Sequence, residues 1–133
     1  MKTLNKIFPV KIAFIVFIAI SFIAVVYHIL ILTQVTPYAN AWGGRLNSVK
    51  EMYVFETFPI ISQMAFVLIG VLKFKQAGGK RSQTMLSVLL YIMSGLLALN
   101  TIGNILSLSS FEAIVFTPIT FVGSLCAFRL ARN

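Results

Sequence analysis

Acidic residues, cysteine and histidine are all scarce in this 133-residue sequence, which contains three acidic residues in total, one cysteine and one histidine. A single cysteine, Cys126, excludes an internal disulfide, a Cys-based metal cluster and a thiol relay within one chain. His28 alone is too little for a metal centre, and the methionines are too scattered to suggest haem or copper ligands. The sequence therefore predicts no metal site and no cofactor.

Charged residues make up only 11% of the chain, whereas 59% is hydrophobic and the mean hydropathy is +0.94. Soluble globular domains do not have this composition. Because each helical crossing of a bilayer needs about 20 apolar residues, the length allows about four crossings and one domain. The net charge of +8 is carried by residues between the apolar runs, where they meet lipid head groups. Nucleic acid is therefore not an expected partner.

Four apolar runs predict an all-α, integral membrane four-helix bundle with up-down topology, formed by residues 1–133 as a single domain. The expected spans are residues 12–32, 54–72, 85–106 and 111–128. The last is the shortest and contains Pro118, which a membrane helix tolerates when neighbouring groups satisfy the freed carbonyl. A cleaved signal peptide is the alternative for the N-terminus, but its apolar run exceeds the usual signal length.

The positions of the cations predict that both termini are cytoplasmic, because Lys and Arg beside the spans favour the cytoplasmic side. One side of the membrane would carry most of them: Lys2, Lys6, Lys11, Lys73, Lys75, Lys80, Arg81, Arg129 and Arg132. The other side would carry only Arg45 and Lys50, near all three acidic residues. We expect this side to face outward.

Two segments match helix-capping patterns. Ser48 followed by Glu51 indicates that the second helix begins near Val49, ahead of its apolar run. Ser109 followed by Glu112 predicts a second capping box, in which the Glu112 carboxylate reaches back to the Ser109 amide. This would explain Glu112 without any functional role.

Polar side chains inside a membrane are costly and usually face the bundle interior, so their positions indicate a candidate site. Helical spacing and depth bring them together in the outer half of the bilayer, with Gln63 at the floor and segment 41–46 above. The predicted site is an outward-facing polar cup that binds a ligand. Its candidate residues are His28, Trp42, Arg45, Glu56, Gln63, Asn100, Asn104 and Glu112.

Segment 41–46 contains Trp42, two glycines and Arg45, and predicts a lid whose arginine turns inward to meet Glu56 or Glu112. The alternative is an aromatic anchor beside a glycine turn with a solvated arginine. A carboxylate at the depth of Glu56 needs a proton or a cationic partner, for which Arg45 and His28 are the nearby candidates. Without a ligand, the same polar residues would serve as hydrogen bonds between helices.

The order Trp42-Gly43-Gly44-Arg45, Glu56, Asn100-Thr101-Ile102-Gly103-Asn104, Phe111-Glu112 and Thr117-Pro118-Ile119-Thr120 resembles a group of small bacterial four-helix membrane proteins. The likeness extends over most of the chain. It implies a four-helix fold in the bacterial plasma membrane, and it supplies no reaction. The motifs of small multidrug transporters, double-barrelled fluoride channels and vitamin K epoxide reductases are not matched.

Three functions fit these features. The first is binding of a small polar molecule, an ion or a lipid head group in the cup, by a transporter component or a sensor. The second is a structural or accessory subunit that contacts another membrane protein or a second copy of the chain, for which small residues on the third helix would allow close packing. The third is a lipid-modifying enzyme that uses His28 and Glu56 as an acid–base pair and requires them within hydrogen-bond reach.

Overall fold

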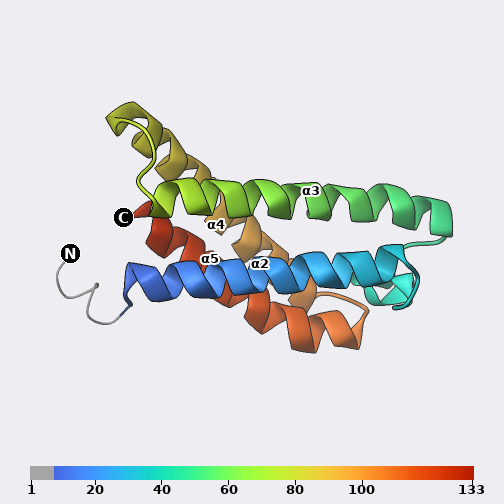
Figure 1. Cartoon of the computed structure of the whole chain (residues 1–133). Coiled ribbons are helices and arrows are strands. Elements are labelled where there is room, and N and C mark those ends of the chain that lie inside the picture. Colours follow the sequence, from blue (N-terminus) through green and yellow to red (C-terminus); the bar gives the residue numbers. More distant parts are fainter. Residues whose placement is uncertain (1–7) are drawn as a thin grey trace.

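The computed structural model describes residues 8–133, so Lys2 and Lys6 lie outside the described residues. Figure 1 shows helices α2, α3, α4 and α5, and the same residues also form two 3-10 turns and one π-helical turn. Their bounds are α2 (Val10–Leu32), η1 (Tyr38–Asn40), η2 (Trp42–Gly44), α3 (Val49–Phe74), α4 (Lys80–Ile105), η3 (Glu112–Phe116) and α5 (Thr117–Ala131). The α-helical fold with four apolar helices is confirmed.

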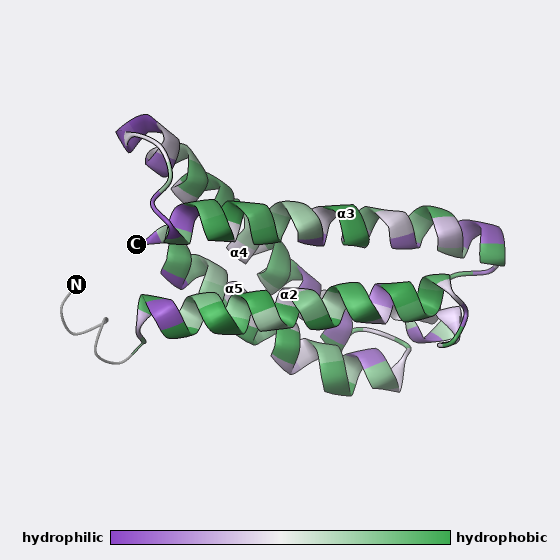
Figure 2. Ribbon diagram, in the orientation of Figure 1, coloured by the Kyte–Doolittle hydropathy of each residue, from purple (hydrophilic) through white to green (hydrophobic). Residues whose placement is uncertain are grey.

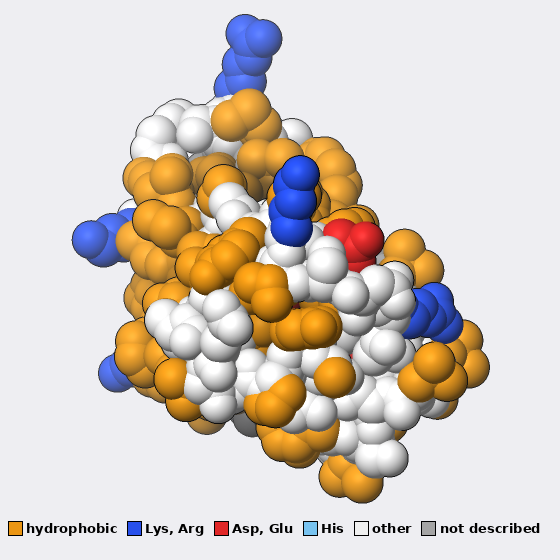
Figure 3. Space-filling model, turned by 90° about the vertical axis from the view of Figure 1, so that its right-hand side faces the viewer, with side chains coloured by type: hydrophobic (Ala, Val, Ile, Leu, Met, Phe, Trp, Pro, Cys, Tyr) orange, Lys and Arg blue, Asp and Glu red, His pale blue; other side chains and the backbone are white. Residues whose placement is uncertain are grey.

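All four helices, the last counted from Glu112 to Ala131, are long and apolar enough to cross a membrane. Green, hydrophobic residues follow each helix in Figure 2, and purple residues gather mainly towards the ends. Large apolar side chains remain exposed, among them Phe58 at 70% and Ile114 at 74%. Seen from the end that carries residues 33–48, hydrophobic side chains reach the surface around much of the outline (Figure 3). Surfaces of this kind are compatible with a membrane protein, because lipid covers them.

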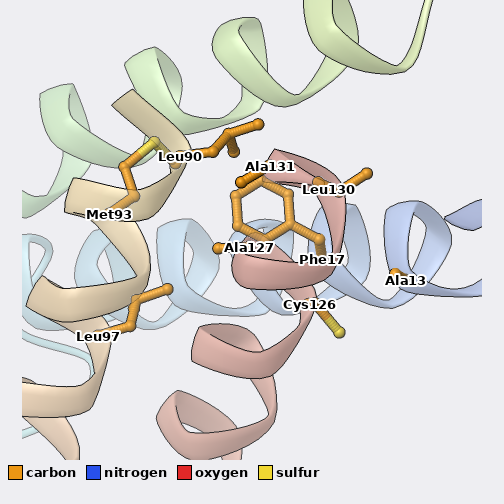
Figure 4. Packing of buried hydrophobic residues seen from close by; sticks show 9 residues of the cluster. All are labelled: Ala13, Phe17, Leu90, Met93, Leu97, Cys126, Ala127, Leu130 and Ala131. Carbon is orange, nitrogen blue, oxygen red and sulfur yellow. The ribbon is translucent and has the colours of Figure 1, made fainter. Parts of the chain in front are cut away.

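The interior is a small apolar core between α2, α4 and α5. Figure 4 shows its residues, which are Ala13, Phe17, Leu90, Met93, Leu97, Cys126, Ala127, Leu130 and Ala131. α2 also lies beside α3, where Phe17 packs on Gly70 so closely that an added Cβ would be 2.9 Å from the ring. The small residue is therefore required for this approach of the two helices.

Hydroxyl groups join α4 to α5. Ser94 and Ser124 each donate to the other's backbone carbonyl at 2.9 Å, and Thr101 donates to the Thr120 hydroxyl at 2.9 Å. Hydrogen bonds between small polar side chains are a common way to pair helices in lipid. These contacts between the two helices are thus made by uncharged side chains.

Local sequence explains how α3 and the last span begin. The Ser48 hydroxyl accepts from the Glu51 amide at 3.2 Å, and α3 begins at Val49, as the sequence predicts. The Glu51 carboxylate reaches one residue further back, to the Asn47 amide at 2.9 Å. The last span contains the π-helical turn η3, which ends at Phe116, two residues before Pro118. Proline has no amide hydrogen and crowds the preceding turn, and a wider π turn relieves this conflict.

Candidate functional site

Glu56 is a completely buried carboxylate, with 0% of its side chain exposed. His28 Nδ1 lies 2.6 Å from Glu56 Oε2, and the Trp42 indole donates to Glu56 Oε1 at 2.8 Å. A buried carboxylate is stable only when its oxygens receive hydrogen bonds or charge. Both oxygens of Glu56 are therefore satisfied, one by a histidine and one by a tryptophan.

Three different elements position this cluster. His28 lies in the last turns of α2, and Glu56 lies two turns into α3, four residues after the buried Met52 on the same face. Trp42 belongs to the connection between these helices and has a positive φ of 55°, followed by Gly43 at 70° and Gly44 at 71°. A positive φ is costly for tryptophan, so this backbone conformation is retained by its surroundings. The bond to Glu56 is one such restraint.

A second buried carboxylate, Glu112, holds the neighbouring residue of the same connection. The Gly43 amide donates to Glu112 Oε2 at 2.7 Å, and the Ser107 hydroxyl donates to the same oxygen at 2.6 Å. The Leu108 amide also donates to the Gly43 carbonyl at 3.3 Å. Residues 33–48 are therefore fastened at Trp42 and Gly43 by two carboxylates from two different helices.

The predicted role of Glu112 in a capping box is wrong. The Ser109 hydroxyl does accept from the Glu112 amide, at 3.4 Å. The Ser109 amide, however, donates to the Ser107 hydroxyl at 3.0 Å, and the Glu112 carboxylate turns to Gly43 instead. This contact gives the Glu112 carboxylate and the Gly43 amide a hydrogen-bond partner each. Because the two residues are far apart in the sequence, no local sequence pattern could predict it.

Beneath this connection lies a cavity of about 380 Å³. Its lining is mixed, with polar groups from α2, α4 and η3 and aromatic rings from α2 and from residues 33–48. The lining residues are Tyr27, His28, Ala41, Trp42, Gly43, Arg45, Pro59, Asn100, Gly103, Asn104, Leu106, Ser107, Glu112 and Phe116. This volume is enough for a small molecule or a lipid head group.

Most of the candidate residues from the sequence come together here. His28, Trp42, Arg45, Asn100, Asn104 and Glu112 line the cavity, and Glu56 lies directly behind His28 and Trp42. Gln63, two turns further along α3, is half-buried and does not line it.

Of the two interpretations of segment 41–46, the structure agrees with the solvated arginine and not with an inward turn of Arg45 towards a carboxylate. Within residues 8–133, the one contact between a carboxylate and a basic side chain is the hydrogen bond of His28 with Glu56, and Arg45 is exposed at the rim of the cavity. Of the two cationic candidates for Glu56, the partner is therefore His28. Its Nδ1 is engaged by Glu56, while the ring, 19% exposed, borders the cavity. The free ring nitrogen, Nε2, is thus the atom of the pair that remains available to a ligand.

Tyr27, Ser107 and Phe116 were not among the candidates. The Tyr27 hydroxyl donates to the Asn40 carbonyl at 2.8 Å, and its ring packs on Phe116 with 4.4 Å between centroids. Nothing in the sequence distinguishes Tyr27 from an ordinary aromatic residue at the membrane interface. The spacing of Ser107 after Asn100 and Asn104 places it in the same polar stripe, although α4 ends at Ile105, two residues before it.

Among residues 8–133, no three His, Cys, Asp or Glu side chains come close enough to hold a metal ion. The chain matches no protein-family model, no curated protein and no solved structure. Its length, apolar helices and exposed apolar surface are those of a multi-pass membrane protein. Any more specific activity has to be argued from the cavity itself.

Proposed function

We propose that this chain is a multi-pass protein of the bacterial plasma membrane that binds a small polar molecule, an ion or a lipid head group in the cavity. It would act as a transporter component or a sensor, with the cavity on the outer side. The bacterial membrane is proposed from the sequence resemblance, and the binding role from the geometry of the cavity.

The distribution of charge supports this orientation. In Figure 1 the described chain begins and ends at one end of the bundle, where residues 75–79 also lie, and residues 33–48 lie at the opposite end. The first end carries Lys11, Lys73, Lys75, Lys80, Arg81, Arg129 and Arg132 and no acidic residue. By the positive-inside tendency, this end is cytoplasmic and the helices alternate in direction. The cavity then faces outward.

The burial of Glu56 is the observation that carries the binding role. Burying a carboxylate costs several kcal/mol before its partners compensate. α4 and α5 are joined by serine and threonine hydroxyls, which avoid this cost. Glu56 restrains Trp42, but this restraint alone does not require a second partner that is a histidine at the border of a cavity. Costly ionisable groups of this kind inside membrane proteins usually serve a binding site or a pathway.

Thermal unfolding of the detergent-purified full chain tests the binding role. Suitable probes are inorganic phosphate, glycerol phosphate, ammonium, choline and phospholipids of defined head group. A probe that binds the native state at a hundred times its Kd stabilises it by about 2.7 kcal/mol. We expect at least one probe to raise the melting temperature of the wild type.

Arg45→Ala and Asn100→Ala should unfold like the wild type without a probe, because both side chains are exposed, and should lose the response to the probe. Lys50→Ala, which removes an exposed cation outside the cavity, is the matched control and should keep it. A response equal in all four proteins, or none in any, would contradict the binding role.

A second function, acid–base catalysis on a lipid, is favoured by the 2.6 Å contact between His28 and Glu56. Hydrogen-bond reach was the geometric requirement for this function. A carboxylate on Nδ1 fixes the ring and leaves Nε2 to accept a proton from a ligand hydroxyl. Lipid vesicles incubated with the protein would then show a change in lipid mass that His28→Gln abolishes. Unchanged lipid masses would leave binding as the function.

A further inference from the structure

The cavity also has an open side between α3 and α4. Pro59 borders it from α3, Asn100 and Gly103 border it from α4, and Leu106 borders it directly after the end of α4. Asn100, Gly103 and Leu106 are exposed, and a Cβ added to Gly103 would meet no atom within 4 Å. The cavity therefore continues onto the outer face of α4, at the flank that faces α3.

This opening lies at membrane depth. At 1.5 Å per residue, Pro59 is about 15 Å from the start of α3 at Val49, and Asn100 is about 8 Å from the end of α4 at Ile105. The side chains around it are apolar and exposed, such as Phe58, Leu99 and Ile102. If α3 and α4 cross the bilayer, a molecule in this opening comes from the acyl-chain region. Its outer part must be apolar.

The polar end of the cavity indicates the charge of the ligand. Both carboxylates are hydrogen-bonded by other protein groups. Glu56 contacts His28 and Trp42, and Glu112 contacts Gly43 and Ser107. Arg45, the one arginine of the lining, makes no ion pair with another residue of 8–133. Guanidinium groups bind phosphate well, through parallel hydrogen bonds. Among residues 8–133, Glu112 has no cationic partner, but it accepts hydrogen bonds from Gly43 and Ser107, so the charged group of the lining that no described side chain contacts in an ion pair is the Arg45 guanidinium.

We infer that the cavity binds the phosphate-bearing head group of an anionic phospholipid, which enters from the outer leaflet between α3 and α4. Arg45 contacts the phosphate, and the Asn100 amide and His28 Nε2 are available to the remaining polar atoms of the head group. The acyl chains leave through the opening at Gly103. This inference rests on the proposed function and names the ligand class of the same cavity.

Melting temperatures of the detergent-purified full chain with three probes separate the lipid from its head group. The probes are phosphatidylglycerol, phosphatidylcholine with the same acyl chains, and glycerol phosphate. We expect phosphatidylglycerol to raise the melting temperature and the other two to leave it unchanged. Equal stabilisation by glycerol phosphate would overturn entry from the bilayer, and equal stabilisation by phosphatidylcholine would overturn the anionic class. Either result would leave the proposed binding role intact, whereas no effect of any probe would also contradict that role.

Two glycines of α4 provide a test variant for the opening and its matched control. Gly103→Leu fills the space beside the cavity, and Gly95→Leu makes the same change two turns earlier, where a Cβ also meets nothing within 4 Å. We expect Gly103→Leu to raise the apparent Kd for phosphatidylglycerol at least about tenfold and Gly95→Leu to leave it unchanged. Equal affinities would contradict the lateral opening. A change of oligomeric state in Gly103→Leu alone would show that a second copy covers this flank, which would also overturn the inference.

Discussion

At the scale of single residues, Glu56 is the group on which the cluster depends, because it accepts hydrogen bonds from two different donors. Glu56→Gln places an amide NH₂ against one of those donors, so we expect it to lower the free energy of unfolding by about 1–3 kcal/mol. Chemical denaturation in detergent measures this change. Glu51→Gln is the control; Glu51 is exposed and its replacement should cost less than about 0.5 kcal/mol. Equal effects of the two variants would show that the buried bonds of Glu56 are not made.

Tyr27 provides a second pair of variants. Tyr27→Phe removes the hydroxyl that donates to Asn40, and should destabilise the protein by about 0.5–1.5 kcal/mol. Tyr91→Phe removes a hydroxyl from an exposed ring that packs edge-on against Phe128, and should have little effect. The difference between the two unfolding midpoints is the quantity to measure. A larger loss for Tyr91→Phe would argue against the contact between α2 and the connection.

The positions of polar side chains along and around the helices were easier to predict than the partners that these side chains contact. The depth and face of His28, Glu56 and Asn104 follow from helical period and rise, which need only the sequence. Which cation meets Glu56 depends on the path of residues 33–48, and this path is set by long-range bonds such as that from Gly43 to Glu112. For this reason the sequence could not decide between an inward and a solvated Arg45, and the structure has it exposed.

At the scale of elements, Gly70 controls how closely α2 and α3 approach. Gly70→Ala would place a methyl group 2.9 Å from the Phe17 ring, and this overpacking should cost about 1–3 kcal/mol. Gly95→Ala, on the open face of α4, should be neutral or stabilise by up to about 1 kcal/mol, because alanine is the better helix former. Thermal unfolding of both variants checks this. Stabilisation by Gly70→Ala would mean that Phe17 does not pack there.

Apolar runs were enough to predict four helices, because an uninterrupted hydrophobic stretch of this length has few other stable forms in lipid. The start of α3 also followed from Ser48 and Glu51, since capping is a local interaction. The π-helical turn η3 and the positive φ of Trp42 were not predicted. The turn η3 accompanies Pro118, and the positive φ of Trp42 is retained by its tertiary contacts. Neither a proline nor a tryptophan by itself predicts these backbone conformations.

At the scale of the whole molecule, the proposed orientation predicts which loops a membrane-impermeant thiol reagent reaches in intact cells. In a Cys126→Ala background, Val35→Cys and Ser110→Cys should be labelled from outside, because both positions are exposed at the end that carries the cavity. Gly79→Cys, exposed between α3 and α4, should be labelled only after permeabilisation. The reverse pattern would place the cavity on the cytoplasmic side and contradict the orientation.

The central claim is that the cavity behind Trp42 and beside His28 is a ligand site. An experimental structure of the protein in a bilayer that contains phosphatidylglycerol tests it most directly. We predict non-protein density in the cavity, in contact with Arg45 and Asn100, with an apolar continuation past Gly103. An empty cavity, or α3 closed onto α4 over Asn100 and Gly103, would contradict the account.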